Sequence, residues 1–432
     1  MTKTGLVWFR NDLRVHDQIS LVKAAKENNF VMAIYCFDPR HFEKDRFGFV
    51  KTEKYRAQFL IETVNALQDQ LNELNIPLFV HFEKPETILP EYIKIHKVSS
   101  VYLQKEWTSE EVNVLKNVKA NVGTHVDFVE NYDQFLYHPE DIPYEIGKIP
   151  QVFTEFRKKC EKYAHIRPLE TIAKMPEKNR VAHLTKVPTL KEVGLAAFEQ
   201  DVRTAFPFKG GEKAGLERLQ NYFWETKKLS YYKNTRNGLV GTDYSSKFSA
   251  WLANGSLSPR MIYHEVKKYE AEIVKNQSTY WLIFELIWRD FFKYISLKHE
   301  NTIFKLEGIL HKTYDWNRDA TRIQQWINGE TSEPFVNANM LELKHTGWMS
   351  NRGRQNVASY FAKTLELDWR IGAAYFESLL LDYDVHSNYG NWMYVSGVGN
   401  DPRNRTFNVK LQAERYDANK KFQNRWLQTS LF

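Results

Sequence analysis

Apolar and polar residues alternate with different periods in the two halves of the chain. In the first 130 residues, short apolar runs rich in β-branched and aromatic side chains are typical of buried strands; they cover residues 5–9, 30–37, 76–82, 98–104 and 125–130. Between the second and third runs, apolar residues recur every three or four positions over 53–74, which predicts a helix. Strands that alternate with helices predict a doubly wound parallel sheet, an α/β fold.

The second half of the chain follows the helical period almost to its end. Apolar residues recur at helical spacing over 215–232, 278–299 and 354–385, and the middle stretch is apolar on every side, which predicts a buried helix. Between the halves, much of the proline and little periodicity favour an extended segment. The sequence therefore predicts three parts: an α/β domain over 1–131, an extended interdomain connector over 132–208, and a mostly α-helical domain over 209–432.

Parallel sheets of this kind bind ligands at the carboxyl ends of their strands. That rule draws attention to residues 9–17, FRNDLRVHD, after the first strand and to residues 105–111, KEWTSEE, after the fourth. No dinucleotide-binding or P-loop glycine pattern follows the first strand, which argues against ordinary nucleotide use of this domain.

Composition narrows the function classes only modestly. A net charge of +7 weakly favours a polyanionic partner, although ordinary solvated charge is the commoner reason for such a value. Cys36 and Cys160 are the two cysteines, which excludes a disulfide framework, and the histidines show no ligand spacing, so we expect no metal. With no long apolar run and no signal-peptide pattern, we expect a cytoplasmic monomer that does not contact a membrane.

Three serines lie just before an apolar helical run in the stretch GTDYSSKFSAWL. Ser245, Ser246 and Ser249 would place hydroxyl groups beside free backbone N–H groups, an arrangement that suits a phosphate or pyrophosphate. Ordinary N-capping explains the same serines and is the simpler interpretation of this segment taken alone. Both interpretations stay open from these residues alone.

The buried helix predicted over 278–299 carries a carboxylate between two indoles. Trp281, Glu285 and Trp288 are spaced i, i+4 and i+7, so they share one face. Burying an unpaired carboxylate is costly. Glu285 therefore either forms a core ion pair, with Arg289 or another neighbour, or faces a polar ligand in a cavity.

Two further carboxylates, Asp382 and Asp384, surround an expected helix end in the stretch LDYDVHSNYGNWMY. Such a pair suits acid/base catalysis or a metal, but the arginines of SNRGR, residues 350–354, are simpler partners. We therefore prefer ion pairing to metal binding. A carboxylate held by an arginine stays ionised and in place, ready to position a planar heterocycle.

Several long motifs, in order along the chain, resemble the photolyase and cryptochrome family, and within it the DASH-type cryptochromes. They are LVWFRNDLRVHD, YKNTRNGLVGTDYSSKFS, TGWMSNRGRQNVASY, DWRIGAAYFESLLLDYDVHSNYGNW and VSGVGNDPRNRTFN. The resemblance spans nearly the whole chain. It implies a helical C-terminal domain that binds FAD in a U-shaped form and an α/β domain that binds an antenna chromophore.

The resemblance also implies which residues contact FAD. Positions that match the segment for the phosphates and the ribityl chain are Tyr232, Ser245, Ser246, Lys247, Phe248 and Ser249. Positions that match the surroundings of the flavin ring are Asn351, Arg354, Asp382 and Asp384, with a salt bridge expected between Arg354 and Asp382, and Asn388, which would face flavin N5.

Three tryptophans, Trp392, Trp369 and Trp316, match a chain along which an electron passes from the surface to the photoexcited flavin. Taken alone, each is an ordinary core tryptophan. The resemblance makes electron transfer the preferred interpretation.

On the substrate side, Glu285 and Trp288 match residues that contact a flipped cyclobutane pyrimidine dimer; with Asn388 they are the expected catalytic residues. Arg352 matches a contact to the DNA backbone.

Two positions resemble the DASH subgroup rather than the photolyases that repair duplex DNA: Gln355, where those enzymes usually have Met, and Tyr394, where they usually have a second stacking Trp. A smaller aromatic side chain offers less stacking to offset flipping from a duplex, so we expect single-stranded DNA as the substrate. For the antenna, Glu106 of the α/β domain is the best match to a contact and Lys298 of the helical domain a weaker one, with 5,10-methenyltetrahydrofolate as the expected antenna.

The sequence therefore predicts a blue-light-dependent deoxyribodipyrimidine photo-lyase that repairs dimers by photoinduced electron transfer. The alternative is a photoreceptor that signals or regulates transcription without repair, because Glu285, Trp288 and Asn388 are compatible with both. His386 departs from the commonest DASH residue. We expect it either to alter protonation near the flavin or to lie at an exposed helix end.

Overall fold

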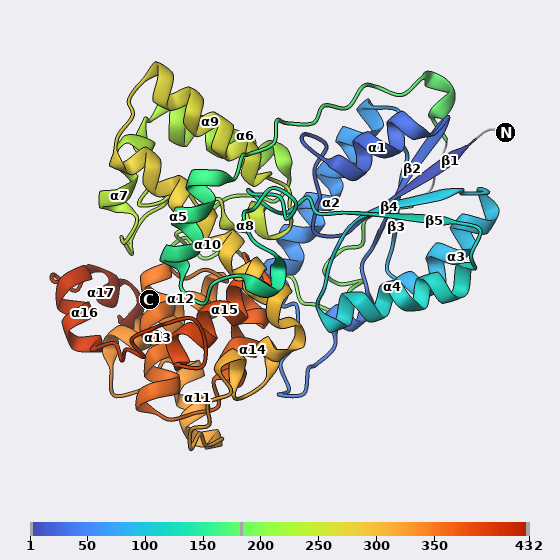
Figure 1. Cartoon of the computed structure of the whole chain (residues 1–432). Coiled ribbons are helices and arrows are strands. Elements are labelled where there is room, and N and C mark those ends of the chain that lie inside the picture. The colour runs from blue at the N-terminus through green and yellow to red at the C-terminus, as the bar shows by residue number, and fades with distance from the viewer. Residues whose placement is uncertain (1–2, 182–184, 429–432) are drawn as a thin grey trace.

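The computed structural model describes residues 3–181 and 185–428. Its N-terminal part is a parallel five-stranded sheet in the order β3-β2-β1-β4-β5 (Figure 1). Each strand overlaps one of the predicted apolar runs: β1 Thr4–Phe9, β2 Phe30–Cys36, β3 Leu78–His81, β4 Ser100–Gln104 and β5 Asp127–Asn131. The middle strands are buried on both faces, which is why they are apolar at every position instead of alternating.

Helices cover both faces of this sheet. Helices α1 (Ile19–Glu27) and α2 (Lys54–Glu73) pack on the face that carries Val7, and α3 (Pro85–Ile95) and α4 (Ser109–Val122) pack on the face that carries Leu6. Successive residues of β1 thus enter different hydrophobic cores. The predicted doubly wound α/β arrangement is confirmed.

The predicted helical domain is also confirmed, and it lies beside the sheet domain (Figure 1). Helix α10 crosses its core, and a capping box at Asn276 fixes the start of that helix. The bounds are α6 Glu212–Gln220, α7 Tyr232–Thr235, α8 Ser249–Ala253, α9 Pro259–Glu272, α10 Gln277–His299, α11 Ala320–Asn328, α12 Pro334–Thr346, α13 Asn351–Ser359, α14 Trp369–Leu379, α15 Val385–Ser396, α16 Val409–Tyr416 and α17 Lys421–Leu427. Short π-helical turns follow α6 and α13.

The segment between the domains contains a helix that the sequence analysis did not predict. Helix α5 (Phe153–Tyr163) buries Phe153, Phe156 and Cys160, which are spaced i, i+3 and i+7, and it packs against α10. Most of its other residues are charged and exposed, so the helical period rests on three positions only. The connector therefore contributes aromatic side chains to the helical core as well as linking the domains.

The loop after β1 joins the two domains through buried ion pairs. Arg260 of α9 binds Asp17 at 2.9 Å and Asp133 at 2.7 Å, and Arg14 binds Asp133 at 2.8 Å, with every one of these side chains at most 2% exposed. Residues 9–17, which we expected at a ligand edge, thus serve domain docking. None of the helices in the described part of the chain combines the length and apolarity needed to span a bilayer.

Candidate functional site

Three segments that lie far apart in the sequence meet around Trp348. Its Nε1 donates a hydrogen bond to the hydroxyl of Tyr244 at 3.0 Å, and Lys247 Nζ lies 3.2 Å from the centroid of the Tyr244 ring and 4.7 Å from that of Trp348. The guanidinium of Arg354 lies 5.7 Å from the Trp348 ring. Arg354 Nη2 also donates to both carboxylate oxygens of Asp382, at 2.8 and 3.0 Å. The predicted salt bridge between Arg354 and Asp382 is confirmed.

Arg218 of α6 holds the backbone of the serine segment. Its Nε donates to the carbonyl of Ser246 and its Nη2 to that of Ser245, both at 3.1 Å. The N-cap residue of α8 is Phe248, which has no side-chain cap, so ordinary N-capping by a serine does not explain this segment. Ser246 is buried and Ser249 exposed. Sequence reasoning missed Arg218, because it lies on another helix and no known motif links an arginine at this separation to the serines.

Two buried atoms of titratable side chains in this region have no hydrogen-bond partner within the described residues: Lys247 Nζ and, near Lys247 and Arg354, Glu342 Oε2. Burial lowers the pKa of Lys247 well below its usual value and raises the pKa of Glu342 to about 8. An anionic ligand would give Lys247 the acceptors it lacks. The residues present therefore fit a cofactor that carries a pyrophosphate, and Glu342 is a further polar residue at this place that no motif had marked.

Glu285 of α10 forms its ion pair with Arg236, the residue that ends α7. Arg289 does not take part, because it donates to the carbonyls of Gln134 at 2.5 Å and Leu252 at 3.0 Å. Burial raises the pKa of Glu285, and the charge of Arg236 acts in the opposite sense. Arg236 thus supplies the ion pair that offsets the burial of Glu285. Because the Glu285 side chain is 28% exposed, it is still accessible to a ligand.

The indole of Trp288 lies edge-on to Tyr394, with the ring centroids 6.1 Å apart and the planes at 86°. Tyr394 accepts a hydrogen bond from Arg405 Nη2 at 3.0 Å. The structure thus brings together the two aromatic residues predicted to face DNA.

The other two residues predicted to face DNA also meet. Arg352 Nη1 donates to Gln355 Oε1 at 2.9 Å, and the guanidinium lies 4.6 Å from the centroid of the Tyr416 ring. Burial lowers the pKa of Arg352, and the charge of Arg236 acts in the same direction. Arg236 is also the ion-pair partner of Glu285, so Arg352 lies near the face of α10 that carries Glu285.

The carboxylates at the start of α15 are both paired, as expected, but by different cations. Asp384 binds Lys293 Nζ of α10 at 2.7 Å, not an arginine of residues 350–354, and it caps α15 by accepting from the Ser387 backbone N–H at 2.8 Å. Burial acts to raise the pKa of Asp384, but the neighbouring positive charges, led by Lys293 and joined by Arg289, together outweigh it, and the pKa lies well below its usual range. One turn further along α15, the buried Asn388 donates from Nδ2 to the carbonyl of Ala373 at 3.0 Å. Asn351, by contrast, begins α13 and is exposed, and Tyr232 is buried at the start of α7.

Two of the predicted tryptophans meet at helix α14: Trp369 belongs to it, and Trp392 packs against it. Trp369 is the first residue of α14, and Gly372 follows it by one turn. A Cβ added to Gly372 would lie 2.2 Å from Cη2 of Trp392, so the Trp392 ring rests directly on the α14 backbone. Both indoles are buried.

The third tryptophan lies towards the surface. Asn317, which follows Trp316, accepts a backbone hydrogen bond at 2.9 Å from Asp368, which precedes Trp369. Trp316 is only half-buried. Trp392 and Trp369 are thus buried at the same helix, and the backbone next to Trp316, which is half-buried, is hydrogen-bonded to the backbone next to Trp369.

Comparison with known proteins places the chain in a family. A family model described as DNA photolyase matches residues 5–177, and one described as the FAD binding domain of DNA photolyase matches residues 281–430. The chain is 47% identical to Cryptochrome DASH of Gloeobacter violaceus over 429 residues, which cover 99% of this chain and 86% of the relative. The chain belongs to the DASH cryptochromes of the photolyase family.

Other DASH cryptochromes are similar over almost the same length. One from Solanum lycopersicum, named as chloroplastic/mitochondrial, is 43% identical, with 98% of this chain and 76% of the relative covered. The crystal structure of a Synechocystis cryptochrome superposes with a TM-score of 0.94 at 46% identity and covers 98% of this chain and 88% of that one. The predicted DASH resemblance is confirmed, and the helical half carries the FAD-binding domain of this family.

The residues expected to contact an antenna in a DASH cryptochrome have partners within the protein. Glu106 Oε1 accepts from Gln104 Nε2 at 2.7 Å, and burial raises the pKa of Glu106 to about 7. Lys298 Nζ donates to the carbonyl of Ile149 at 2.6 Å. The antenna role of both residues stays a prediction.

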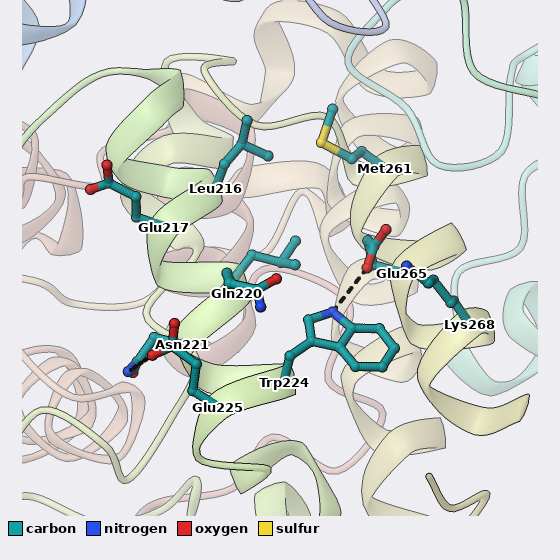
Figure 2. Close-up of a pocket in the computed structure, with 10 residues that line it drawn as sticks. Leu216, Glu217, Gln220, Asn221, Trp224, Glu225, Met261, Glu265 and Lys268 are labelled. Atoms are coloured by element: carbon teal, nitrogen blue, oxygen red, sulfur yellow. Dashed lines mark hydrogen bonds between the residues drawn. The ribbon is translucent and has the colours of Figure 1, made fainter. Parts of the chain in front are cut away.

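A hollow of about 780 Å³ lies between α6 with its following turn and α9 (Figure 2). Trp224 Nε1 donates to Glu265 at 3.1 Å across it, and the Lys268 ammonium lies 5.0 Å from the Trp224 ring. No predicted site residue is among the described residues that line it, which are Leu216, Glu217, Leu219, Gln220, Asn221, Trp224, Glu225, Met261, Glu265 and Lys268. The hollow is therefore distinct from the region around Trp348.

His386, a departure from the usual DASH residue, is buried at the domain interface. Its ring stacks on Trp107 at 4.4 Å, and its Nδ1 lies 2.9 Å from Ser296 Oγ, which also accepts from Trp107 Nε1 at 3.0 Å. The expectation of an exposed helix end is wrong, because α15 begins beneath the loop that follows β4. Burial lowers the pKa of His386 well below its usual value; the charge of Lys293 adds to this, and that of Asp384 opposes it.

The buried His386 should make stability depend on pH. The unfolded chain takes up a proton near pH 6.5, whereas folded His386 stays neutral, so stability is retained above that pH and lost as the pH falls below it. His386→Phe keeps a ring to stack on Trp107 but cannot titrate. We expect wild-type melting temperatures to fall more steeply than those of the variant from pH 7 to pH 5, with a contribution of at most about 1.4 kcal/mol per pH unit. Parallel pH profiles would contradict this assignment.

Proposed function

We propose that this DASH cryptochrome is a blue-light-dependent lyase that splits cyclobutane pyrimidine dimers in single-stranded DNA. The observation that carries the proposal is the meeting, around Trp348, of the serine and lysine segment with the Arg354–Asp382 pair. FAD, when bound and reduced, would absorb the light and supply the electron that the dimer takes up and gives back, so that the splitting of the ring is redox-neutral overall.

The cofactor side of the proposal rests on the chain's own charges. Lys247 would meet the phosphates with a buried amino group, whose protonated form their negative charge would favour, beside a loop whose backbone is held by Arg218. Arg354, fixed by Asp382, would present its guanidinium at a constant position to the flavin ring, and Asn388, held by the carbonyl of Ala373, would set the polar environment of N5. The other residues that the family resemblance implies for the cofactor are Tyr232, Ser245, Ser246, Phe248, Ser249, Asn351 and Asp384.

The substrate side rests on the exposed part of α10. Glu285, held by Arg236, would accept hydrogen bonds from the base edges of a flipped dimer, and Trp288 would stack on its face. Tyr394 offers a smaller aromatic surface beside Trp288, which favours single-stranded DNA, where no base pair has to be broken. Arg352 would contact the DNA backbone. Such contacts fix the position of the protein on the DNA but do not read the base sequence.

We propose a route for electrons from the surface to the flavin through Trp316, Trp369 and Trp392. The half-buried position of Trp316 and the burial of the other two indoles at α14 support it. The remaining parts of the proposal follow the family resemblance and the sequence: a methenyltetrahydrofolate antenna near Glu106 and Lys298, a cytoplasmic location, and a monomer.

The repair reaction can be tested by illuminating the reduced, flavin-loaded protein with a dimer-bearing single-stranded oligonucleotide and measuring recovered thymines by chromatography. We expect recovery only in the light. Trp288→Ala should weaken binding of this oligonucleotide by about 1–3 kcal/mol, because one base loses its stacking partner. Trp224→Ala, in the hollow of Figure 2, is the matched control and should bind as wild type does. No recovery with FAD bound would reject repair and favour the photoreceptor alternative.

A further inference from the structure

We propose that Phe153, on α5 of the connector, is a positioning residue that fixes the plane of Trp288 against a flipped pyrimidine dimer. The inference rests on the proposed function, because the dimer is taken as the stacking partner of Trp288. Phe153 belongs to none of the motifs recognised in the sequence.

Phe153 lies face to face with Trp288. The ring centroids are 3.6 Å apart and the planes are inclined by 11°. Phe153 also meets Phe284 edge-on at 5.2 Å and Phe291 at 5.5 Å, with interplanar angles of 85° and 72°. Phe284, Trp288 and Phe291 are spaced i, i+4 and i+7 on α10, so Phe153 is seated on one stripe of that helix.

The chain just before Phe153 is tied down on two sides. Lys298 Nζ of α10 donates to the carbonyl of Ile149 at 2.6 Å, and Asn400 Nδ2 donates to that of Gln151 at 2.8 Å. The loop that contains Asn400 continues to Arg405, the hydrogen-bond partner of Tyr394. The position of Phe153 is therefore coupled to both aromatic residues of the proposed DNA face.

Neighbouring rings limit the directions from which a ligand can reach the indole, because Phe292 lies 5.5 Å from it at 32° and Tyr394 6.1 Å from it at 86°. Phe153 is 6% exposed and covers one face of Trp288, while Tyr394 meets an edge. Trp288 is only half-buried, so its exposed part lies away from Phe153. A ring held in one plane loses less freedom when a base stacks on it, which favours binding without a new contact to the base.

The test compares Phe153→Leu, which keeps an apolar side chain of similar size but removes the ring plane, with Phe153→Tyr, which keeps the plane. Affinities for a dimer-bearing single-stranded oligonucleotide and its undamaged counterpart are measured in the dark by fluorescence anisotropy on flavin-loaded protein. We expect Phe153→Leu to lose dimer affinity by about two- to tenfold. We expect Phe153→Tyr to match wild type, and all variants to keep the wild-type flavin absorbance and the wild-type repair rate at saturating DNA.

Phe156→Leu is the matched control. Phe156 lies one turn further along α5, is buried, and packs on Phe291 and Tyr294, so its loss should loosen the same helix without changing dimer affinity. Full dimer affinity in Phe153→Leu, an equal loss in Phe156→Leu, or loss of flavin from Phe153→Leu would overturn the inference. Equal affinity of the wild-type protein for the dimer-bearing and the undamaged oligonucleotide would instead overturn the proposed function. It would also remove the dimer as the stacking partner of Trp288.

Discussion

Replacing Asp382 with alanine should yield a purified protein with little bound flavin. The Asp382 carboxylate is 3% exposed and accepts two hydrogen bonds from Arg354, whose side chain is 23% exposed. Removing one partner of a buried ion pair costs about 3–5 kcal/mol, and the partial exposure of Arg354 places the expected cost at the lower end. Arg354 also donates from Nε to the carbonyl of Met349 and lies over Trp348, so a released guanidinium would disturb the whole region where the motifs meet.

The measurement is the ratio of flavin to protein absorbance in the desalted sample. Asp201→Ala is a matched control, because Asp201 is also paired by an arginine, Arg203, but on the connector and in partial contact with solvent. We expect this control to retain its flavin. Full flavin occupancy in Asp382→Ala would contradict the proposed role of the pair.

Replacing Trp369 with phenylalanine should block most light-driven reduction of the flavin while leaving the flavin bound. Trp369 is the middle member of the three tryptophans, and phenylalanine keeps an aromatic ring there but is much harder to oxidise. The substitution also removes the hydrogen bond from Nε1 to the carbonyl of Leu306, 3.0 Å long, at a cost of about 1 kcal/mol, which a folded domain tolerates. The measurement is flavin absorbance during blue illumination with an external reductant.

A second buried tryptophan supplies the control for this experiment. Trp326 lies 6.3 Å from Trp392, is as buried as Trp369, and donates from Nε1 to the carbonyl of Val357 at 3.1 Å. Trp326→Phe therefore loses the same kind of contact without interrupting the proposed route, and we expect it to photoreduce normally. Undiminished reduction in Trp369→Phe, or loss of reduction in Trp326→Phe alone, would contradict the assignment.

Much of the fold was predictable because buried parallel strands and long amphipathic helices leave strong apolar patterns. Helix α5 was missed because its pattern depends on Phe153, Phe156 and Cys160 within a highly charged stretch. A period that rests on three residues cannot be distinguished from chance until the surface it packs against is known.

The candidate site was predictable where both partners of a contact lie in recognisable motifs, as Arg354 and Asp382 do. The cations that pair with Glu285 and Asp384 were not, because Arg236 and Lys293 come from other helices and only tertiary packing brings them near. His386 was misplaced for a similar reason: its surroundings are made by the loop after β4, from the other domain.

The ion pairs between the loop after β1 and α9 have a consequence for dissecting the molecule. A fragment that begins at residue 209 would retain Arg260 but lose both of its carboxylates, and the complementary fragment would leave Asp17 without its cation and Asp133 with Arg14 alone. Stranded charges of this kind favour the unfolded chain. The α/β domain and the helical domain should therefore melt together, in one cooperative step.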